Sequence, residues 1–169
     1  VINNKQVGPE NNVRLSAISL YKQIGRSAQS GAMVSDAMDA IKETGILPLD
    51  TPENRAKFGN HVMPATGFST RYPQGWEETA KKFRGVEFFV INSVRALLTA
   101  LLNGHPVVVG REGHSILYLR PMRRSGRIVV KYVNSWGNWG DKGFGYDTEP
   151  QFRKSAAWAF AIRSVTVQG

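Results

Sequence analysis

The stretch of sequence that decides the fold runs from Tyr132 to Tyr146 and reads YVNSWGNWGDKGFGY. It contains two Trp-Gly pairs, at positions 136–137 and 139–140, flanked by β-branched and aromatic residues. A turn between two strands needs glycine, but it does not need tryptophan, a large side chain that is usually buried or placed at a contact surface. The stretch is therefore a candidate functional loop.

A histidine lies in the run Gly113–Tyr118, which reads GHSILY, twenty positions before Asn134. An imidazole can act first as a base and then as an acid when it is held in one tautomer and one orientation. A side-chain amide oxygen that accepts the other ring N–H holds it in this way. His114 and Asn134 are candidates for such a pair.

Together, the two stretches resemble the histidine strand and the Asn-Ser-Trp-Gly segment of the papain-like cysteine peptidases. The resemblance implies that His114 opens a strand that forms a hairpin with the strand carrying Asn134, and that Asn134 orients the imidazole. Trp136 would lie over their hydrogen bond and exclude water, which strengthens the bond in a lower dielectric. Gly113 and Trp136 would contribute to substrate binding.

The segment Gln6–Ala17 also resembles this family, whose members carry a glutamine, a short glycine-rich loop, and then Cys-Trp at the start of a long helix. Gln6 matches the oxyanion-hole glutamine, whose amide donates to the developing oxyanion. The nucleophile position is occupied by Asn12, and Val13 replaces the usual tryptophan.

Asn12 cannot perform the chemistry of the family, and the chain contains no cysteine at all. A thiolate attacks because it ionises readily, whereas an amide neither ionises nor attacks a peptide carbonyl at useful rates. An asparagine can cap a helix instead, which stabilises it by about 1 kcal/mol. Neither Ser16 nor Ser115 takes the place of the nucleophile in the motif, so we expect no hydrolysis.

The segment Ser30–Met33 is similar to the Gly-Gly substrate-binding strand of the family, although only one glycine is kept. Gly31 and Ala32 would then offer backbone groups to an extended peptide. The alternative is a surface loop before an ordinary helix. His114 follows Val109 almost at once, where the family carries a longer excursion, so we expect the cleft to be open on the barrel side.

The apolar residues recur at helical spacing in residues 1–85, and from Pro106 onward they form short β-branched and aromatic runs. With the resemblance, this pattern predicts an α+β, papain-like two-lobe fold in one compact unit. A helical lobe, 1–85, would pack on an antiparallel β-barrel-like lobe, 86–169, that carries His114 and Asn134.

The central helix is expected to start near Val13 and to end before Gly25. Four further helices are expected from caps and apolar spacing: a second from Ser35 to Thr44 closed by Gly45, a short third at Thr51–Glu53, a fourth at Trp76–Phe83, and a fifth at Val94–Asn103 capped by Ser93. The expected strands are Val86–Ile91, Val107–Val109, Ser115–Leu119, Ile128–Val133, Phe144–Tyr146 and Trp158–Val167, with a hairpin tip at Arg124–Gly126.

The chain is basic, with a formal net charge of +9 at pH 7. A surface of this sign favours anionic partners such as nucleic acid or acidic protein, although it also serves solubility. Aromatic residues for base stacking are sparse around the main cluster, with Tyr118 and Tyr132 the nearest. The cluster holds six cations against one acid, Glu112: Arg111, Arg120, Arg123, Arg124, Arg127 and Lys131.

Several classes of protein and site are excluded or disfavoured by composition. Hydrophobic residues make up 41% and charged residues 21% of the chain, which is typical of a folded globular protein. The longest apolar stretches, Ala96–Leu102 and Ala156–Ile162, are far shorter than the roughly 20 residues of a membrane helix. Without cysteine there is no disulfide, and the three histidines lack the paired spacing of a metal site. We expect no metal and no cofactor.

Three hypotheses for function remain open at this point. The first is a papain-like peptidase homologue without the catalytic thiol, which is proteolytically inactive and binds protein or peptide in the cleft between the lobes. The second is a cysteine endopeptidase whose natural nucleophile at position 12 has been exchanged for asparagine. The third is an electrostatic binder of nucleic acid or acidic partners.

Overall fold

The computed structural model describes residues 13–49, 56, 68–69, 71–72, 74–111, 113–155 and 159–165. The chain divides into two compact units, one made mainly of Asn3–Val86 and the other mainly of Glu87–Arg163. Gln6, Asn12 and the expected helix at Thr51–Glu53 lie outside the described residues. Each unit is described below by itself.

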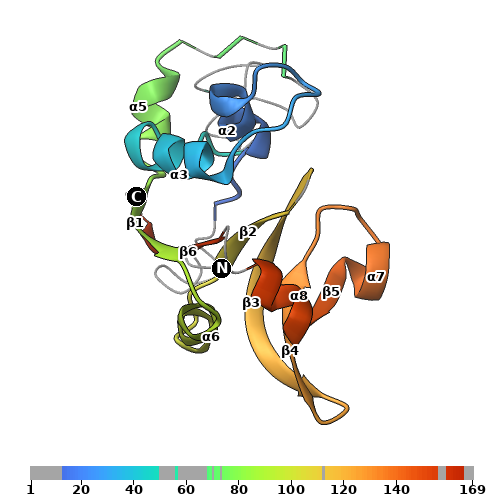
Figure 1. Cartoon of the computed structure of the whole chain (residues 1–169). Coiled ribbons are helices and arrows are strands. Elements are labelled where there is room, and N and C mark those ends of the chain that lie inside the picture. The colour runs from blue at the N-terminus through green and yellow to red at the C-terminus, as the bar shows by residue number, and fades with distance from the viewer. Residues whose placement is uncertain are drawn as a thin grey trace. The chain divides into compact units, whose positions relative to one another are not determined.

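The first unit contains three described helices, α2 (Ala17–Ile24), α3 (Val34–Glu43) and α5 (Trp76–Ala80) (Figure 1). Helices α2 and α3 pack against each other. Leu47 and Ala80 form a small buried cluster with hydrophobic neighbours that are themselves partly buried. These neighbours are Ile18, Tyr72 and Trp76.

Helix α2 begins at Ala17, later than the start near Val13 that the apolar spacing predicts. The residues before it are held in an extended conformation, since the backbone N–H of Ser16 donates to the carbonyl oxygen of Leu47 at 2.8 Å. The Ser16 side chain then caps the helix by accepting from the N–H of Ser19. Pairing with a distant segment therefore overrides the helical spacing over this turn.

Helix α3 also differs in its start, because its N-cap is Met33 and not the expected Ser35. The hydroxyl of Ser35 donates to Asp36 instead, at 3.2 Å. At the other end the expected Gly45 follows the helix with φ +91°, a conformation that side chains rarely adopt. A Cβ at this position would lie 2.0 Å from the carbonyl oxygen of Ala80, so only glycine lets the chain approach α5.

A six-stranded sheet occupies the β-rich half, as expected, and four of its neighbouring strand pairs are antiparallel. The strands in spatial order are β1 (Gly85–Ile91), β6 (Ala159–Val165), β2 (Val107–Arg111), β3 (His114–Arg124), β4 (Arg127–Val133) and β5 (Phe144–Thr148) (Figure 1). The sheet is not closed, since β1 and β5 lie at opposite ends of this order. The expected β-rich lobe is therefore present as an open sheet and not as a closed barrel.

Helix α6 (Val94–Leu102) confirms the expectation for this segment, including its cap. The hydroxyl oxygen of Ser93 accepts from the N–H of Ala96 at 3.1 Å. Leu97 and Leu101 on this helix are buried together with the inward residues of the sheet. The core of this unit is formed by Ile91, Leu97, Leu101, Val107, Val109, Ile116, Tyr118, Val130, Tyr132, Phe152, Ala159 and Ala161.

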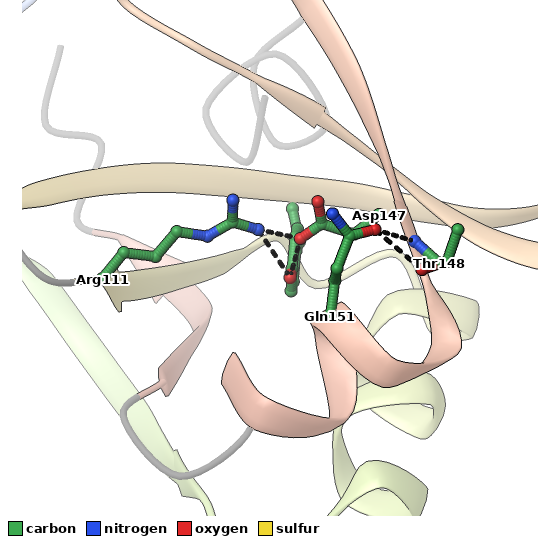
Figure 2. A network of polar contacts seen from close by, with 5 residues as sticks. Arg111, Asp147, Thr148 and Gln151 are labelled. Atoms are coloured by element: carbon green, nitrogen blue, oxygen red, sulfur yellow. Dashed lines mark hydrogen bonds and ion pairs between the residues drawn. The ribbon is translucent and has the colours of Figure 1, made fainter.

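Two helices of the second unit were not expected from the sequence, the short α7 (Trp139–Lys142) and α8 (Glu149–Ser155). At the start of helix α8 the side-chain oxygen of Gln151 accepts from both the backbone N–H and the hydroxyl of Thr148 (Figure 2). This is the capping-box spacing, three residues apart. Phe152 is the one fully buried hydrophobic side chain of this helix. A single apolar residue gives no helical periodicity, so the sequence did not predict α8.

Candidate functional site

His114 is the first residue of β3 and is placed by a tight hairpin with β2. Arg111, the last residue of β2, is paired with His114, so only two residues separate the strands. One of them, Gly113, has φ +68°, in the left-handed region where side chains are disfavoured. The glycine before the histidine is thus required by the turn that aims the imidazole.

Asn134 directly follows β4, which is paired antiparallel with β3 in the expected hairpin. Its backbone N–H donates to the carbonyl oxygen of Gly143 at 2.9 Å, and the residue is 8% exposed. The imidazole Nε2 of His114 lies 2.8 Å from the side-chain oxygen of Asn134. The structure therefore brings together the two residues that are twenty positions apart in the sequence.

The direction of this hydrogen bond fixes the tautomer of the imidazole. A carboxamide oxygen can only accept, so Nε2 carries the proton and the neutral ring presents a lone pair at Nδ1. Within the described part of the chain, Nδ1 of His114 makes no hydrogen bond. The pair is thus arranged so that Nδ1 can take up a proton while Asn134 keeps the ring in place.

Trp136 lies over the imidazole, as the sequence predicts. The two rings are stacked with centroids 4.5 Å apart and an angle of 28° between their planes. Trp139 meets Trp136 edge to face at 5.8 Å. Trp136 remains 57% exposed, so one side of this indole covers His114 while much of its surface faces solvent.

A polar network that the sequence analysis missed lies beside this hairpin (Figure 2). Asp147 of β5 is 1% exposed, and its carboxylate forms an ion pair with the guanidinium of Arg111. The hydroxyl of Tyr118 donates to the same carboxylate oxygen. Burial raises the pKa of Tyr118 above its ordinary value, which keeps this hydroxyl a donor.

The network corrects the expectation that Arg111 belongs to the basic surface. Its charge is neutralised by Asp147, and its guanidinium also lies over the ring of Tyr132 at 5.2 Å. The signal in the sequence was the position of Asp147, which falls in the inward register of the alternating strand β5. An acid at such a position requires a buried partner.

The other cations of the expected cluster are at the surface. Arg120, Arg123, Arg124 and Arg127 are exposed and Lys131 is partly exposed. Among the described residues, none of the five forms a salt bridge.

The remaining candidates belong to the first unit or lie outside the described residues. Gly31 and Ala32 are exposed and precede α3, and no atom lies within 4 Å of a Cβ built on Gly31. Their predicted role in peptide binding stays a prediction, as do the roles of Gln6 and Asn12. Ser16 is fully buried at the start of α2, and its side-chain oxygen accepts from the N–H of Ser19.

The described residues contain no group of three or more His, Asp or Glu side chains that could hold a metal ion. None of their helices is long and apolar enough to cross a membrane.

Comparison with known proteins rests on structure alone, because no protein-family model and no curated sequence matches the chain. The chain is similar to xylellain, a cysteine protease from Xylella fastidiosa, with a TM-score of 0.64 and 16% identity over 89% of this chain and 70% of that one. It is also similar to the digestive procathepsin L2 proteinase of Tenebrio molitor, with a TM-score of 0.70 and 14% identity over 95% of this chain and 56% of that one.

A third solved structure, procathepsin B S9 from Trypanosoma congolense, matches with a TM-score of 0.62 and 15% identity over 96% of this chain and 64% of that one. The chain thus spans between 56% and 70% of the length of these three proteins. At such low identity the likeness establishes the fold and leaves the activity open. The chain has the papain-like cysteine protease fold, in a sequence that contains no cysteine.

Proposed function

We propose that this protein is a papain-like peptidase homologue without hydrolytic activity, which works by binding protein or peptide beside His114. The observation that carries the proposal is an ordered pair of His114 and Asn134, 2.8 Å apart, in a chain that has no thiol for it to activate. Trp136 adds an exposed aromatic surface at the same place.

Hydrolysis by a serine in place of the thiol is opposed by the positions of the two candidate hydroxyls. Ser16 is fully buried and engaged in the cap of α2. Ser115 is exposed but follows His114 in a strand, where successive side chains point to opposite faces. Loss of the nucleophile in a serine protease lowers turnover by about 10⁶-fold. We therefore expect the protein to show no measurable turnover of peptides.

A second candidate function is that of a cysteine endopeptidase in which asparagine has been exchanged for the natural nucleophile at position 12. It is favoured by the intact geometry of His114, Asn134 and Trp136, a set that suits thiol activation. Under this hypothesis the natural coding sequence holds a cysteine codon at position 12. Under the first it holds an asparagine codon.

One experiment tests both candidates with the same reagents. The purified protein, Asn12→Cys, and Asn12→Cys combined with His114→Ala are incubated with a panel of fluorogenic peptides and with a thiol-alkylating inhibitor. Steady turnover by the unchanged protein would refute the first proposal. Turnover by Asn12→Cys that is lost in the double variant would support the second, and silence of a folded Asn12→Cys would count against it.

Binding is measured separately on the unchanged protein, with a library of N-acetylated hexapeptides added in pools. Peptides that bind beside His114 should shift its imidazole NMR signals and change the fluorescence of Trp136. Trp136→Ala should weaken the affinity of the selected peptides at least tenfold if the indole is part of the site. The matched control is Trp76→Phe in the first unit, which should leave the affinity unchanged. An unchanged affinity in Trp136→Ala would show that the peptide binds elsewhere on the protein.

A further inference from the structure

The hairpin of β3 and β4 projects beyond its neighbour as a two-stranded ribbon (Figure 1). The last register pair between β4 and β5 joins Val129 to Thr148. Two further pairs of the hairpin lie beyond it, Arg123 with Ile128 and Arg124 with Arg127. The chain then reverses at Ser125–Gly126, where both residues have positive φ. The tip is therefore a narrow, well-defined β-ribbon.

This ribbon carries five cations and, in the described residues, no carboxylate within salt-bridge distance of them. We define the basic ribbon as Arg120, Arg123, Arg124, Arg127 and Lys131. Strand alternation places Arg120 and Arg124 on one face of β3, and their register partners on β4, Lys131 and Arg127, lie on the same face. Arg123 lies on the opposite face, next to the tip. Four of the five cations therefore share one face of the ribbon.

The basic ribbon is held by aromatic residues from β5 that the sequence analysis did not connect with it. The guanidinium of Arg124 lies 4.2 Å from the ring centroid of Tyr146, and the ammonium of Lys131 lies 3.8 Å from that of Phe144. Tyr118 and Tyr132, the aromatics expected to be nearest, are buried in the core instead. The two rings on β5 already carry cations, so they do not offer a free face for stacking nucleobases.

We propose that the basic ribbon binds the phosphate backbone of duplex DNA by entering its major groove. The groove of B-form DNA, about 12 Å wide, admits a two-stranded β-ribbon and has a row of phosphates along each wall. The four cations on one face can meet the phosphates of one wall, and Arg123 on the other face can meet the opposite wall. An acidic peptide on the first face would leave Arg123 unused, and four of the five cations are arginine, the side chain preferred for phosphate and nucleic-acid recognition. This surface is separate from the site at His114.

The test uses the whole chain and a fluorescein-labelled 24-base-pair DNA duplex, with anisotropy measured at several salt concentrations. Affinity should fall steeply with salt, because each phosphate contact releases counterions and contributes about 0.9 to the slope of log affinity against log salt. Arg124→Gln with Arg127→Gln should lower the slope by about 2 and weaken binding at least tenfold at 50 mM salt. The matched control, Lys82→Gln with Arg95→Gln, removes the same charge at exposed positions and should change the slope by less than about 0.5.

Competing occupants are separated by parallel titrations with single-stranded DNA, duplex RNA and an oligoglutamate peptide of equal charge. The proposal requires the DNA duplex to bind more tightly than each of these three. Equal or tighter binding of oligoglutamate would assign the ribbon to acidic proteins. Equal binding of single-stranded DNA would show that the major groove of a duplex is not needed for binding. Either result would overturn the proposal, as would equal effects of the two double variants. Neither affects the test of peptide binding at His114.

Discussion

Asn134 orients a histidine without adding charge to the site. Its oxygen accepts from Nε2 of His114, and its backbone is itself fixed by the bond to Gly143. A carboxylate at this position would also stabilise the protonated imidazole, whereas a carboxamide supplies only direction. The orientation of the His114 ring therefore depends on one neutral hydrogen bond and on its stacking against Trp136.

We predict that Asn134→Ala releases the tautomer of His114. In the unchanged protein the neutral ring should be almost entirely the Nε2–H form, because the amide oxygen accepts that proton. In the variant both tautomers should be populated, and stability should fall by about 1 kcal/mol for the lost hydrogen bond. Long-range ¹H–¹⁵N NMR correlations of the imidazole measure the tautomer ratio directly. Asn138→Ala, an exposed amide in the same loop, is the control. An unchanged ratio in Asn134→Ala would show that Trp136 and the turn alone hold the ring.

Three strands of the second unit are tied together by the network around Asp147. It joins β5 to Arg111 at the end of β2 and to Tyr118 in β3. The same end of β2 forms the hairpin that carries His114. The network thus holds in place the strand ends that carry the imidazole. Its contribution can be measured as a change in the free energy of unfolding.

We predict that Asp147→Asn destabilises the protein by roughly 2–4 kcal/mol, measured by urea unfolding at pH 7. The substitution leaves the half-buried guanidinium of Arg111 without its counter-charge, which costs more than the loss of an ordinary contact. Glu149→Gln, which breaks the exposed pair with Arg153, is the control and should cost less than about 0.5 kcal/mol.

The same network predicts strong coupling between its members. Arg111→Met added to Asp147→Asn should cost little more than Asp147→Asn alone, since the unpaired cation is then removed. Additive losses from the two substitutions would contradict the pairing of Arg111 with Asp147.

At the scale of the whole molecule, the sequence was informative where local motifs decide the structure. The resemblance of the two segments implies that His114, Asn134 and Trp136 lie together, and in the structure these side chains are in contact, because the turn glycines and strand register act over short distances. The sequence suggested a barrel-like lobe but could not decide whether the sheet closes, since closure depends on which strands meet at long range.

Errors arose where a distant partner overrides the local pattern. Leu47 holds Ser16 extended and delays the start of α2. The ion pair with Asp147 neutralises Arg111, which therefore does not contribute to the basic surface expected from the cations near it in the sequence. Helix α8 was missed for a different reason, since its one buried hydrophobic side chain, Phe152, carries no periodicity, and the contact of Thr148 with Gln151 is a local signal that was not used. For Ser16 and Arg111 the deciding contact is with a residue that the sequence does not mark as a partner.

Each unit contains a tyrosine whose pKa is raised by burial or partial burial, and this predicts how the stability of the whole protein responds to alkaline pH. Burial raises the pKa of Tyr72 to about 12 in the first unit and raises the pKa of Tyr118 in the second. The folded state then keeps protons that the unfolded state releases near pH 10, so the unfolded state binds fewer protons and stability falls as the pH rises through this window. The stabilisation is fully present below pH 10 and is lost on approach to pH 12.

The contribution of Tyr72 can be isolated by substitution. Between pH 9 and pH 11 the free energy of unfolding should fall by about 1 kcal/mol from Tyr72, less than full burial would give because the ring is partly exposed. Tyr72→Phe loses the hydrogen bond to the carbonyl oxygen of Ser19 and should be less stable at pH 9, but its further fall to pH 11 should be smaller by that amount. Urea unfolding at both pH values measures the difference, and absorbance at 295 nm follows the ionisation itself. A variant that loses stability as steeply as the unchanged protein would show that Tyr72 ionises in the folded state as freely as in the unfolded chain.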